Sequence, residues 1–481
     1  MSWCSQGPCR RLRLAALLCV LAGIHAGAAS AQSLIEAARS AYEKNPRLAA
    51  ERARQRATDE EVARAYSAHR PVVTGTADVG YQHIETRPPL LADGTVHPRG
   101  YAVTASQPVF RGFRTVNGVR VAEATVKAGR ETLRTVEQSV LLEAVTTYMD
   151  VVRDQATVRL RENNVVVLDK ELRAARDRFN VGVVSRTDVA QAEARRAAAV
   201  SALELTRANL QSSRAAFERT VGYEPMTLRD RTQPYAKLPK SLDAAIAITS
   251  QEHPSVVATI YNEAAARSNI DLIRGELLPS VRLDASHSRR YDTSNVTEEQ
   301  EVTTVTGRLT VPLYEGGEVH ARVRAAKHTH IGRLQQVEQA RNEMRAATIA
   351  AWSQLIAARA QIESDRVQVA ALETALAGVR AEERAGQRTL LDVLNAELEA
   401  LNARVQLVVD DRNVVVASYA VLAAIGRLSI EALGGSDIAY DAEENYEIVH
   451  RKWWGLSITH ADGRREQHDL WPGKDTKKVR R

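Results

Sequence analysis

Apolar residues recur at three- and four-residue spacing through a long stretch of the first half of the chain. Leu133, Val136, Val140, Ala144 and Tyr148 fall on one helical face, and a second apolar stripe runs beside it. Residues 119–179 contain no proline, so the pattern predicts a helix on the order of 90 Å long at about 1.5 Å per residue. Residues 323–384 predict a second helix of the same kind. Two adjacent stripes indicate packing against neighbours on both sides, as in the wall of a bundle.

Each predicted rod stops at a glycine, Gly182 in the first half and Gly386 in the second. Glycine just past a helix is a common C-terminal cap, because it adopts the left-handed conformation without strain. A new helix then starts at threonine and aspartate residues, which satisfy free N–H groups and the helix dipole. These residues are Thr187, Asp188, Thr389 and Asp392. We therefore predict two helical hairpins with tips at residues 179–188 and 384–392.

Between the helices the period of the apolar residues changes to two, which is the pattern of β-strands. Four segments alternate in this way. They are residues 72–82, 100–110, 280–291 and 301–313. Strands of about ten residues separated by Asp, Asn, Gly and Pro are typical of membrane barrels. The same alternation also fits a half-buried sheet of a soluble protein, and the strands alone do not decide between the two.

The arrangement of rods and strands occurs twice along the chain. A displacement of 204 positions superimposes glycines and aspartates of the two halves. The pairs are Gly182 with Gly386, Asp188 with Asp392 and Gly222 with Gly426. We expect two structural repeats, residues 32–232 and 233–433, each a unit whose exposed faces need a neighbour.

The number of strands limits how this sheet exists in a membrane. Two strands per repeat make four in the chain, whereas single-chain bacterial barrels start at about eight. An open sheet edge is not tolerated in lipid, because its N–H and C=O groups have no partner there. If these strands enter a membrane, several chains must share one barrel.

Residues 1–31 have the features of a cleaved secretory signal. Arg10, Arg11 and Arg13 precede an apolar run that ends in a small-residue cleavage site at Ala31. The run is too short to cross about 30 Å of hydrocarbon, which disfavours a transmembrane anchor. All three cysteines lie in this segment, so we expect the exported chain to lack disulfides, Cys-ligated metals and a Cys nucleophile.

The charge balance is close to neutral for a chain of 481 residues. The formal charge of +6 falls to +3 on cleavage, because the signal removes three Arg and no acidic residue. Arg and Glu are interspersed, without the basic stripe of a nucleic-acid-binding protein. Aromatic residues are only 5% of the chain. This composition is typical of long helices, and we expect no nucleic-acid partner.

With these features, residues 33–433 resemble the TolC-like outer-membrane channels of drug efflux and type I protein secretion. The most specific segments are the two tips, Arg178 to Val189 and Gly386 to Leu394. The strand-to-rod junctions Gln107 to Phe110 and Val311 to Gly317 resemble the family as well. The fold implied is an α+β membrane protein, a homotrimer whose four strands per chain build one twelve-stranded outer-membrane barrel above a periplasmic helical tube.

The resemblance also implies a function and partners. The chain would be the exit duct of a tripartite export system in the outer membrane of a Gram-negative bacterium, surrounded by outer-membrane lipid. A periplasmic adaptor (membrane fusion protein) and an inner-membrane transporter of the RND or ABC type would dock at the tips. The duct would be passive, with an entrance that closes, so the family implies no enzyme activity and no cofactor. Cargo, and the choice between drug efflux and protein secretion, stay open because the transporter makes that choice.

Several tip residues match positions of the family's entrance. Asp392 resembles the acidic constriction residue, which threefold symmetry would turn into a carboxylate ring that favours cations. Its alternative is an ordinary aspartate in the first turn of a helix. Arg388 matches an arginine that ties neighbouring hairpins shut, with Thr187 and Asp188 as partners. Its alternative is a solvated arginine worth less than about 1 kcal/mol.

The chain departs from the family at two positions of the entrance. Asn395 stands where a second acidic ring is usual, and Glu383 replaces a tyrosine of the gate network. We therefore expect a less concentrated carboxylate ring and a closed state that is bonded differently. Blocking by multivalent cations is not inferred for this chain.

Aromatic residues lie at the ends of the predicted strands and resemble a membrane-interface girdle. They are Tyr81, Tyr101, Phe110, Tyr291 and Tyr314. Phe110 and Tyr314 occupy equivalent positions of the two repeats, which favours that role over ordinary packing. Residues 434–481 have no counterpart in the repeat and are expected to be a loosely ordered periplasmic tail.

An adaptor protein and an enzyme are the two alternatives to a channel. A periplasmic coiled-coil adaptor shares the signal and long hairpins, but would show a lipoyl-like β-domain and usually one hairpin. An enzyme would show a catalytic or metal-binding motif. The histidines fall in none: His328 and His330, two apart on a helix, point to different faces. No phosphate-binding glycine loop is found, so we predict no catalytic, cofactor or metal site.

Overall fold

The computed structural model describes residues 33–85, 94–225, 228, 235, 237–294, 296–460 and 464–466. The predicted signal, residues 1–31, lies outside these ranges.

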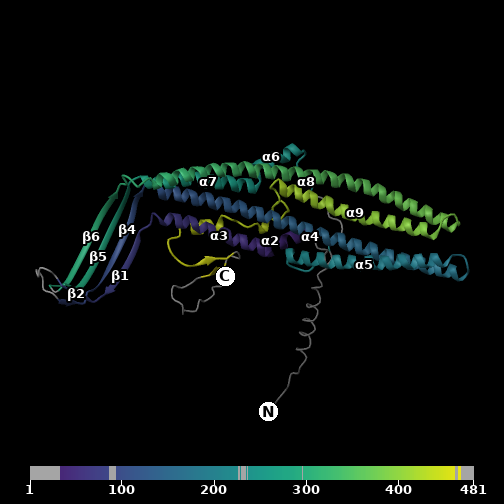
Figure 1. Cartoon of the computed structure of the whole chain (residues 1–481), viewed down its shortest axis with the longest axis horizontal. Coiled ribbons are helices and arrows are strands. Elements are labelled where there is room, and N and C mark those ends of the chain that lie inside the picture. Colours follow the sequence, from purple (N-terminus) through teal and green to yellow (C-terminus); the bar gives the residue numbers. More distant parts are fainter. Residues whose placement is uncertain are drawn as a thin grey trace, which may run out of the picture. The chain divides into compact units, whose positions relative to one another are not determined.

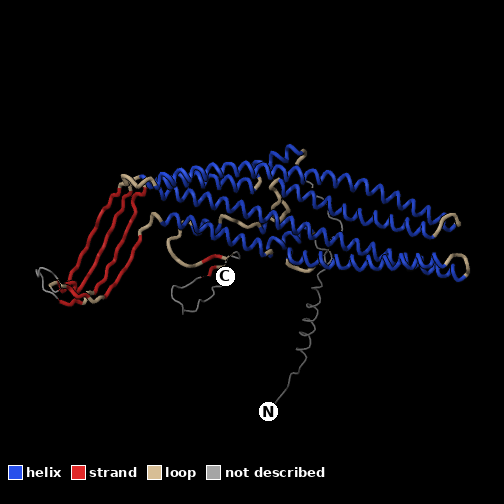
Figure 2. Tube along the Cα trace, in the orientation of Figure 1, coloured by secondary structure: helices blue, strands red, loops and turns tan. Residues whose placement is uncertain are grey.

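The same succession of elements occurs twice: two short helices, two long strands, a very long helix and a return helix (Figures 1 and 2). The first copy contains α2 (Leu34–Lys44), α3 (Pro46–Ser67), β1 (Val72–Val79), β4 (Arg99–Arg111), α4 (Arg114–Asn180) and α5 (Arg186–Val221). The second contains α6 (Leu242–Glu252), α7 (Pro254–Arg274), β5 (Ser280–Ser294), β6 (Thr297–Thr310), α8 (Glu318–Arg384) and α9 (Leu390–Ala424). The predicted duplication is confirmed.

Smaller elements complete the described chain. A two-stranded sheet pairs β2 (Gln82–Ile84) with β3 (Gly94–Val96), and another pairs β7 (Ile458–Thr459) with β8 (Arg465–Glu466). The remaining elements are the 3-10 turns η1 (Gly275–Leu277) and η2 (Ser436–Ile438) and the helix α10 (Glu444–Val449).

The two rods are α4 and α8, each of 67 residues. At about 1.5 Å per residue each is on the order of 100 Å long. Both begin five residues earlier than the periodicity predicted, directly after the turns that follow β4 and β6. In α4 both predicted stripes are buried, including Val140 and Tyr148 of one and Leu141 and Val145 of the other. The prediction of contacts on two sides of this helix is confirmed.

The chain forms two compact units, and both rods run through both of them. One unit comprises Met1–Lys44, Leu141–Lys237 and Leu355–Tyr419 and contains the hairpin tips. The other comprises Asn45–Val140, Leu238–Gln354 and Ala420–Arg481 and contains the strands. The repeat and the compact unit are therefore different divisions of the chain.

The four long strands form one antiparallel sheet in the order β1-β4-β5-β6, drawn in red in Figure 2. β1 ends at Val79 rather than at residue 82, because Gln82–Ile84 pair separately with Gly94–Val96. β6 starts at Thr297, four residues earlier than predicted, since it pairs with β5 up to the turn between them. It ends at Thr310, two residues before Pro312.

The strand register gives the sheet one apolar face. The row formed by Val73, Ala105, Ala285 and Val305 crosses all four strands. Parallel rows on the same face bring further apolar residues together, since side chains on a strand alternate between faces. They are Ala77, Val79, Val103, Phe110, Val281, Leu283 and Leu309. The alternation in the sequence predicted this face correctly.

The opposite face of the sheet is polar. Thr74, Thr104, Ser286 and Thr304 form one of its rows. Closer to the helices, Asp284 accepts hydrogen bonds from Ser106 Oγ at 2.7 Å and from Arg282 Nε at 2.9 Å. At the other end Arg290 lies 3.4 Å from Asp78 across the sheet. The sheet thus separates an apolar surface from a hydrogen-bonding one.

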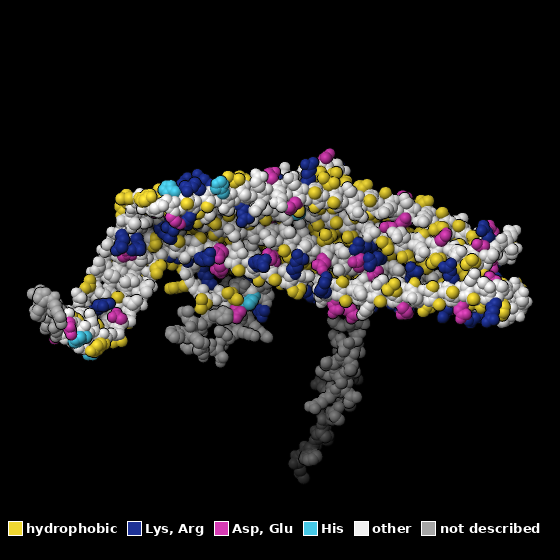
Figure 3. Space-filling view, viewed as in Figure 1, with side chains coloured by type: hydrophobic (Ala, Val, Ile, Leu, Met, Phe, Trp, Pro, Cys, Tyr) yellow, Lys and Arg dark blue, Asp and Glu magenta, His cyan; other side chains and the backbone are white. Residues whose placement is uncertain are grey.

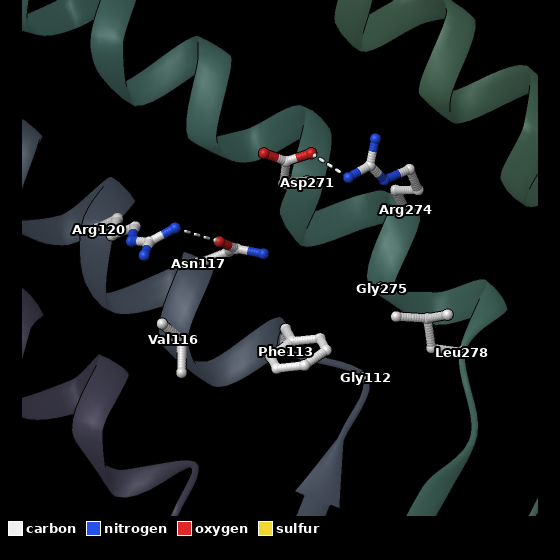
Figure 4. Close-up of a pocket in the computed structure, with 9 residues that line it drawn as sticks. All are labelled: Gly112, Phe113, Val116, Asn117, Arg120, Asp271, Arg274, Gly275 and Leu278. Atoms are coloured by element: carbon white, nitrogen blue, oxygen red, sulfur yellow. Dashed lines mark hydrogen bonds and ion pairs between the residues drawn. The ribbon is translucent and has the colours of Figure 1, made fainter.

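A close contact between two glycines fixes the junction of sheet and helices. Gly112, with φ of +59°, leads from β4 into α4, and a Cβ on it would lie 2.2 Å from the carbonyl oxygen of Gly275. A Cβ on Gly275 would lie 2.3 Å from the carbonyl oxygen of Gly112. Figure 4 shows the hollow that opens beside this contact, between Phe113 and Leu278 and below the Asp271–Arg274 ion pair of 3.0 Å. Here the first repeat meets the start of the strands of the second.

The described part of the C-terminal tail corrects an expectation. It is not loosely ordered: α10 packs on α3, and Tyr446 packs against the buried cluster of Val62, Ala122 and Val126. Asn445 Nδ2 donates to Asp59 Oδ2 at 2.9 Å. The repeat has no counterpart for this segment, so its periodicity offered no signal of the contact.

Charged side chains of both signs are interspersed over the helices on the face shown in Figure 3. No helix within the described residues combines the length and the apolar character needed to cross a membrane.

We predict that Gly112→Ala destabilises the protein far more than Gly316→Ala. Both glycines have positive φ and follow the last strand of a repeat, but nothing lies within 4 Å of a Cβ on Gly316. The substitution at Gly316 therefore meets only the backbone strain, on the order of 1 kcal/mol. Gly112→Ala adds a clash with the Gly275 carbonyl. Thermal unfolding in detergent measures the difference, and equal midpoints for the two variants would contradict the close contact.

Candidate functional site at the hairpin tips

The first tip is closed by two backbone hydrogen bonds at the end of α4. Gly182 N–H donates to the Phe179 carbonyl at 2.9 Å, and Val183 N–H donates to the Arg178 carbonyl at 2.9 Å. Gly182 has φ of +77°, which glycine adopts without a steric penalty. This is the Schellman turn that the glycine predicted.

The second tip repeats this geometry at the end of α8. Gly386 also has φ of +77°, and its N–H donates to the Glu383 carbonyl at 2.9 Å. Gln387 N–H donates to the Glu382 carbonyl at 2.9 Å. The duplicated sequence therefore folds into two backbones of the same form at the tips.

Each return helix starts with a reciprocal capping box. In the first, the Ser185 hydroxyl accepts from Asp188 N–H at 3.2 Å, and the Asp188 carboxylate accepts from Ser185 N–H at 2.9 Å. In the second, Thr389 and Asp392 exchange the equivalent bonds at 3.3 and 3.0 Å. The first cap is thus Ser185, and Thr187 lies exposed in the first turn of α5.

Asp392 has the surroundings of a capping residue within one chain. The backbone and side-chain hydrogen bonds from Thr389, with the nearby charge of Arg388, hold the pKa of Asp392 below its ordinary value. A ring of three such carboxylates would act in the opposite direction, because like charges raise one another's pKa. Asp392 is therefore ionised at neutral pH, and the cap is compatible with a role at an entrance.

Arg388 does not contact Thr187 or Asp188 of its own chain. Its Nε donates to Glu382 Oε2 at 3.0 Å, on the same tip, and both side chains are about half exposed. Within one chain the predicted lock is not assembled. Arg388 has this local partner, and Asp188 is engaged in its capping box.

Near the tips, Glu383 and Asn395 each accept a bond from the other hairpin. Arg178 at the end of α4 donates to Glu383 of α8, whose side chain is only 14% exposed. Arg195 Nη2 of α5 donates to Asn395 Oδ1 of α9 at 2.7 Å. Glu383 and Asn395 thus join the first hairpin to the second.

Further charged residues lie beside these two contacts. Arg380 of α8 is paired with Glu397 of α9, whose side chain is buried. Burial, with the repulsion of Glu397 as a lesser cause, raises the pKa of Glu171 on α4. Nothing in the sequence alone singles out Arg195, Arg380 or Glu171, since charged residues are frequent in both rods.

An apolar cluster lies behind the charged residues and includes side chains of both hairpins. Leu168, Leu172 and Ala175 of α4 pack with Ala192 of α5 and Leu394 of α9. The contact between the hairpins therefore combines apolar burial with polar bonds at its end. Burial fixes the spacing of the helices, and the polar bonds fix which residues face each other.

The predicted interface aromatics lie near both ends of the sheet. Tyr101 and Tyr291 lie toward the ends of β4 and β5 that are far from the rods, and Tyr81 follows β1 and stacks edge-on to His97. Phe110 and Tyr314 lie at the other end, the latter 87% exposed. The girdle stays a prediction.

A metal site would need several His, Cys, Asp or Glu side chains close together within the described residues. No group of three or more His, Cys, Asp or Glu side chains among them is arranged to hold a metal ion.

Comparisons with known proteins identify relatives of the whole chain. The model of the family described as outer membrane efflux protein matches residues 37–223 and 246–427, one range in each repeat. The outer membrane efflux protein BepC of Brucella suis is 38% identical over 462 residues, covering 95% of this chain and 98% of that protein. The outer membrane protein TolC of Vibrio cholerae is 24% identical over 419 residues, covering 85% and 93%. The fold is that of the CmeC outer membrane channel of Campylobacter jejuni, with a TM-score of 0.75, 15% identity and coverage of 87% and 89%.

We predict that Arg178→Ala and Glu383→Ala together loosen the contact between the two hairpins. The pair is partly buried, so its loss should weaken the contact by about 1 kcal/mol, or roughly fivefold in the opening equilibrium. Hydrogen exchange at the tip amides of α5 and α9 measures this opening.

The matched control is Arg196→Ala with Asp169→Ala. That ion pair of 2.7 Å joins α5 to α4 inside the first hairpin. Its loss should speed exchange in the first hairpin alone. Unchanged exchange at α9 in the Arg178/Glu383 variant would show that the pair does not hold the hairpins together.

Proposed function

Because the chain belongs to the outer membrane efflux protein family, we propose that it is the outer-membrane exit duct of a tripartite export system. The observation that carries the proposal is the four-stranded sheet, with one apolar face, one polar face and two open edges. The duct is a passive conduit for drugs or secreted proteins. Its entrance lies at the hairpin tips.

The apolar face has the height that a membrane requires. From Val281 to Arg289, β5 rises about 27 Å at roughly 3.4 Å per residue. Over this distance the side chains of this face change from apolar to charged. The apolar end has Val281, Phe110 and Leu309, and the charged end has Arg289 and Glu301. An outward apolar band of about 25 Å is typical of outer-membrane barrels. Phe110 and Tyr314 would lie at the periplasmic boundary, and Tyr101 and Tyr291 at the outer one.

The open edges require more than one copy of the chain. Among the strands of the described residues, β1 pairs only with β4, and β6 pairs only with β5. In lipid the unpaired groups of both edges need partners. Pairing β6 of one copy with β1 of the next gives a head-to-tail contact that closes into a ring.

Three copies meet two requirements, a closed barrel and an open channel through it. Two copies give about eight strands, an interior that side chains fill, whereas larger barrels leave a channel. Three give twelve strands, in agreement with the family resemblance. The polar face, with Thr104, Ser286 and Thr304, then lines the channel. Outer-membrane lipid contacts the apolar face.

The tips would form the entrance at the periplasmic end of the helical tube. Asp392 of three copies would make a carboxylate ring, and Arg388 of one copy would reach Thr187 and Asp188 of a neighbour. The Arg178–Glu383 and Arg195–Asn395 contacts hold each copy's own hairpins together. A periplasmic adaptor and an RND or ABC transporter would dock here and widen the ring. The chemistry is transport, without catalysis.

Engineered cysteines test the shared barrel, and the exported chain is expected to have no others. Thr76→Cys on β1, combined in turn with Thr304→Cys and Thr306→Cys on β6, should give disulfides between copies in the outer membrane. All three positions lie on the polar face. Mass measurement in detergent should then show a covalent series that stops at three copies.

Thr104→Cys in place of Thr76→Cys is the control, because β4 already has β1 and β5 as neighbours. It should not link to a β6 cysteine of another copy. A monomeric product, or a series that continues beyond three, would contradict the closed trimer. Absence of conductance in a planar bilayer would contradict the conduit itself.

We predict that Asp392→Asn lowers the preference of the channel for cations. Asparagine keeps a side-chain oxygen for the cap of α9, so the variant removes charge with little change in the turn. Asp188→Asn makes the same change at the first tip, where the proposed contact with Arg388 of a neighbour would already compensate the charge, so selectivity should change much less. Reversal potentials in a salt gradient measure the preference.

Acidification offers a second readout of the same carboxylate. The preference of the unmodified channel should fade as pH drops through the pKa of the ring. Equal reversal potentials for Asp392→Asn and Asp188→Asn would mean that Asp392 serves only as a cap.

A further inference from the structure

The C-terminal segment runs beside α3 toward the base of the sheet. The guanidinium of Arg52 lies 5.1 Å from the ring of Tyr440, near the start of the segment. Asn445 bonds Asp59, and Tyr446 packs on Val62, about two to three turns farther along α3. The segment and the helix therefore run in the same direction. Their contacts lead to the turn between α3 and β1.

Arg70, in that turn, holds the end of the segment. Its Nη1 donates to the Lys452 carbonyl at 2.6 Å, and its guanidinium lies 4.9 Å from the ring of Trp453. The turn is itself tied to β4: Gln107 Nε2 donates to the His69 carbonyl at 2.7 Å. β1 starts two residues after Arg70. Trp453 is thus fixed beside the first residues of the strand.

The segment exposes its largest apolar side chains at this place. Trp453 is 68% and Trp454 89% exposed, and Leu456 and Ile458 are also exposed. The loop is nevertheless held: Lys452 Nζ donates to the Ser457 carbonyl at 2.8 Å and contacts its hydroxyl at 3.1 Å. A fixed loop with two outward indoles is a costly arrangement in water, because it leaves large apolar surface hydrated.

The base of the sheet carries exposed apolar residues as well. Val72, Val73, Val109 and Phe113 are each at least 60% exposed. In the proposed duct this level is the periplasmic boundary of the outer membrane. Indole rings are enriched at such boundaries, where the ring is buried and the N–H stays hydrated.

We propose that residues 451–458 are an interfacial anchor that binds phospholipid of the periplasmic leaflet of the outer membrane. Trp453 and Trp454 enter the headgroup region beside the base of β1, and exposed Arg451 lies near lipid phosphate. Arg70 is a positioning residue that orients Trp453. The proposal rests on the outer-membrane location proposed above and adds a lipid site outside the barrel. The contacts along α3 would transmit the position of the membrane surface to the helices.

Tryptophan emission tests the anchor in the full-length channel, because the exported chain has only Trp352, Trp453, Trp454 and Trp471. The channel is reconstituted in vesicles of phosphatidylethanolamine and phosphatidylglycerol with bromine near the headgroup end of the acyl chains. The variant Trp352→Phe/Trp471→Phe, which emits from the segment, should lose roughly half of its emission.

A second variant provides the matched control. Trp453→Phe/Trp454→Phe/Trp471→Phe emits only from Trp352, which lies about 50 Å along α8 from its first residue. Its emission should not change. Bromine near the methyl end of the chains should quench the segment less than bromine near the headgroup.

The role of Arg70 is tested in the variant that emits from the segment. Arg70→Gln should lower the quenching, whereas Arg64→Gln, at an exposed position of the preceding helix α3, should not. No bromine quenching of Trp453 and Trp454 in conducting channels would overturn the anchor. A blue-shifted emission without quenching would assign the indoles to a protein contact and would also overturn it. Loss of conductance would instead count against the duct, so the two failures are distinguishable.

Discussion

The unpaired backbone groups along β1 and β6 are the constraint on which the rest of the molecule depends. A four-stranded sheet has two open edges, and lipid offers no hydrogen bond to either. The protein meets this constraint with a sheet whose register separates an apolar from a polar face. In the proposed assembly, closure with other copies would satisfy the edges, hide the polar face and expose the apolar one. The pairing of the edges, the hidden polar face and the exposed apolar face therefore depend on one another.

The same constraint explains why the rods leave apolar surface uncovered in one chain. Ile331, Leu334, Ile349, Ile356 and Val367 of α8 are exposed, although α4 buries both of its stripes. A helix of a finished domain would bury such residues, because hydration of each is unfavourable. Once the edges bring copies together, neighbouring rods can cover this surface. The sheet and the rods therefore call for the same assembly.

Local patterns predicted most of the fold, and the reasons are physical. Alternation predicted the apolar face through Val73 and Ala105, because side chains on a strand must alternate. Glycine predicted the tips, because Gly182 and Gly386 adopt positive φ. The contact of Gly112 with Gly275 was not predictable, since each glycine alone is compatible with many turns. The tail was missed for a similar reason: its hold on α3 depends on single pairs such as Asn445 with Asp59, without a period.

At the hairpin tips, the resemblance to a family indicates the form of the backbone but not the bonding partners of individual side chains. Both tips have the same turn and the same capping box, so the backbone does not distinguish them. For Glu383 and Asn395 the resemblance implied a less concentrated carboxylate ring and a closed state that is bonded differently. In the structure they accept bonds from Arg178 and Arg195, and these arginines lie on the other hairpin. A departure at one position is understandable only with its partner, which lies about 200 residues away and is invisible to local patterns. These two bonds therefore lie within a single copy, and the contact between copies at the tips stays a proposal that rests on Asp392 and Arg388.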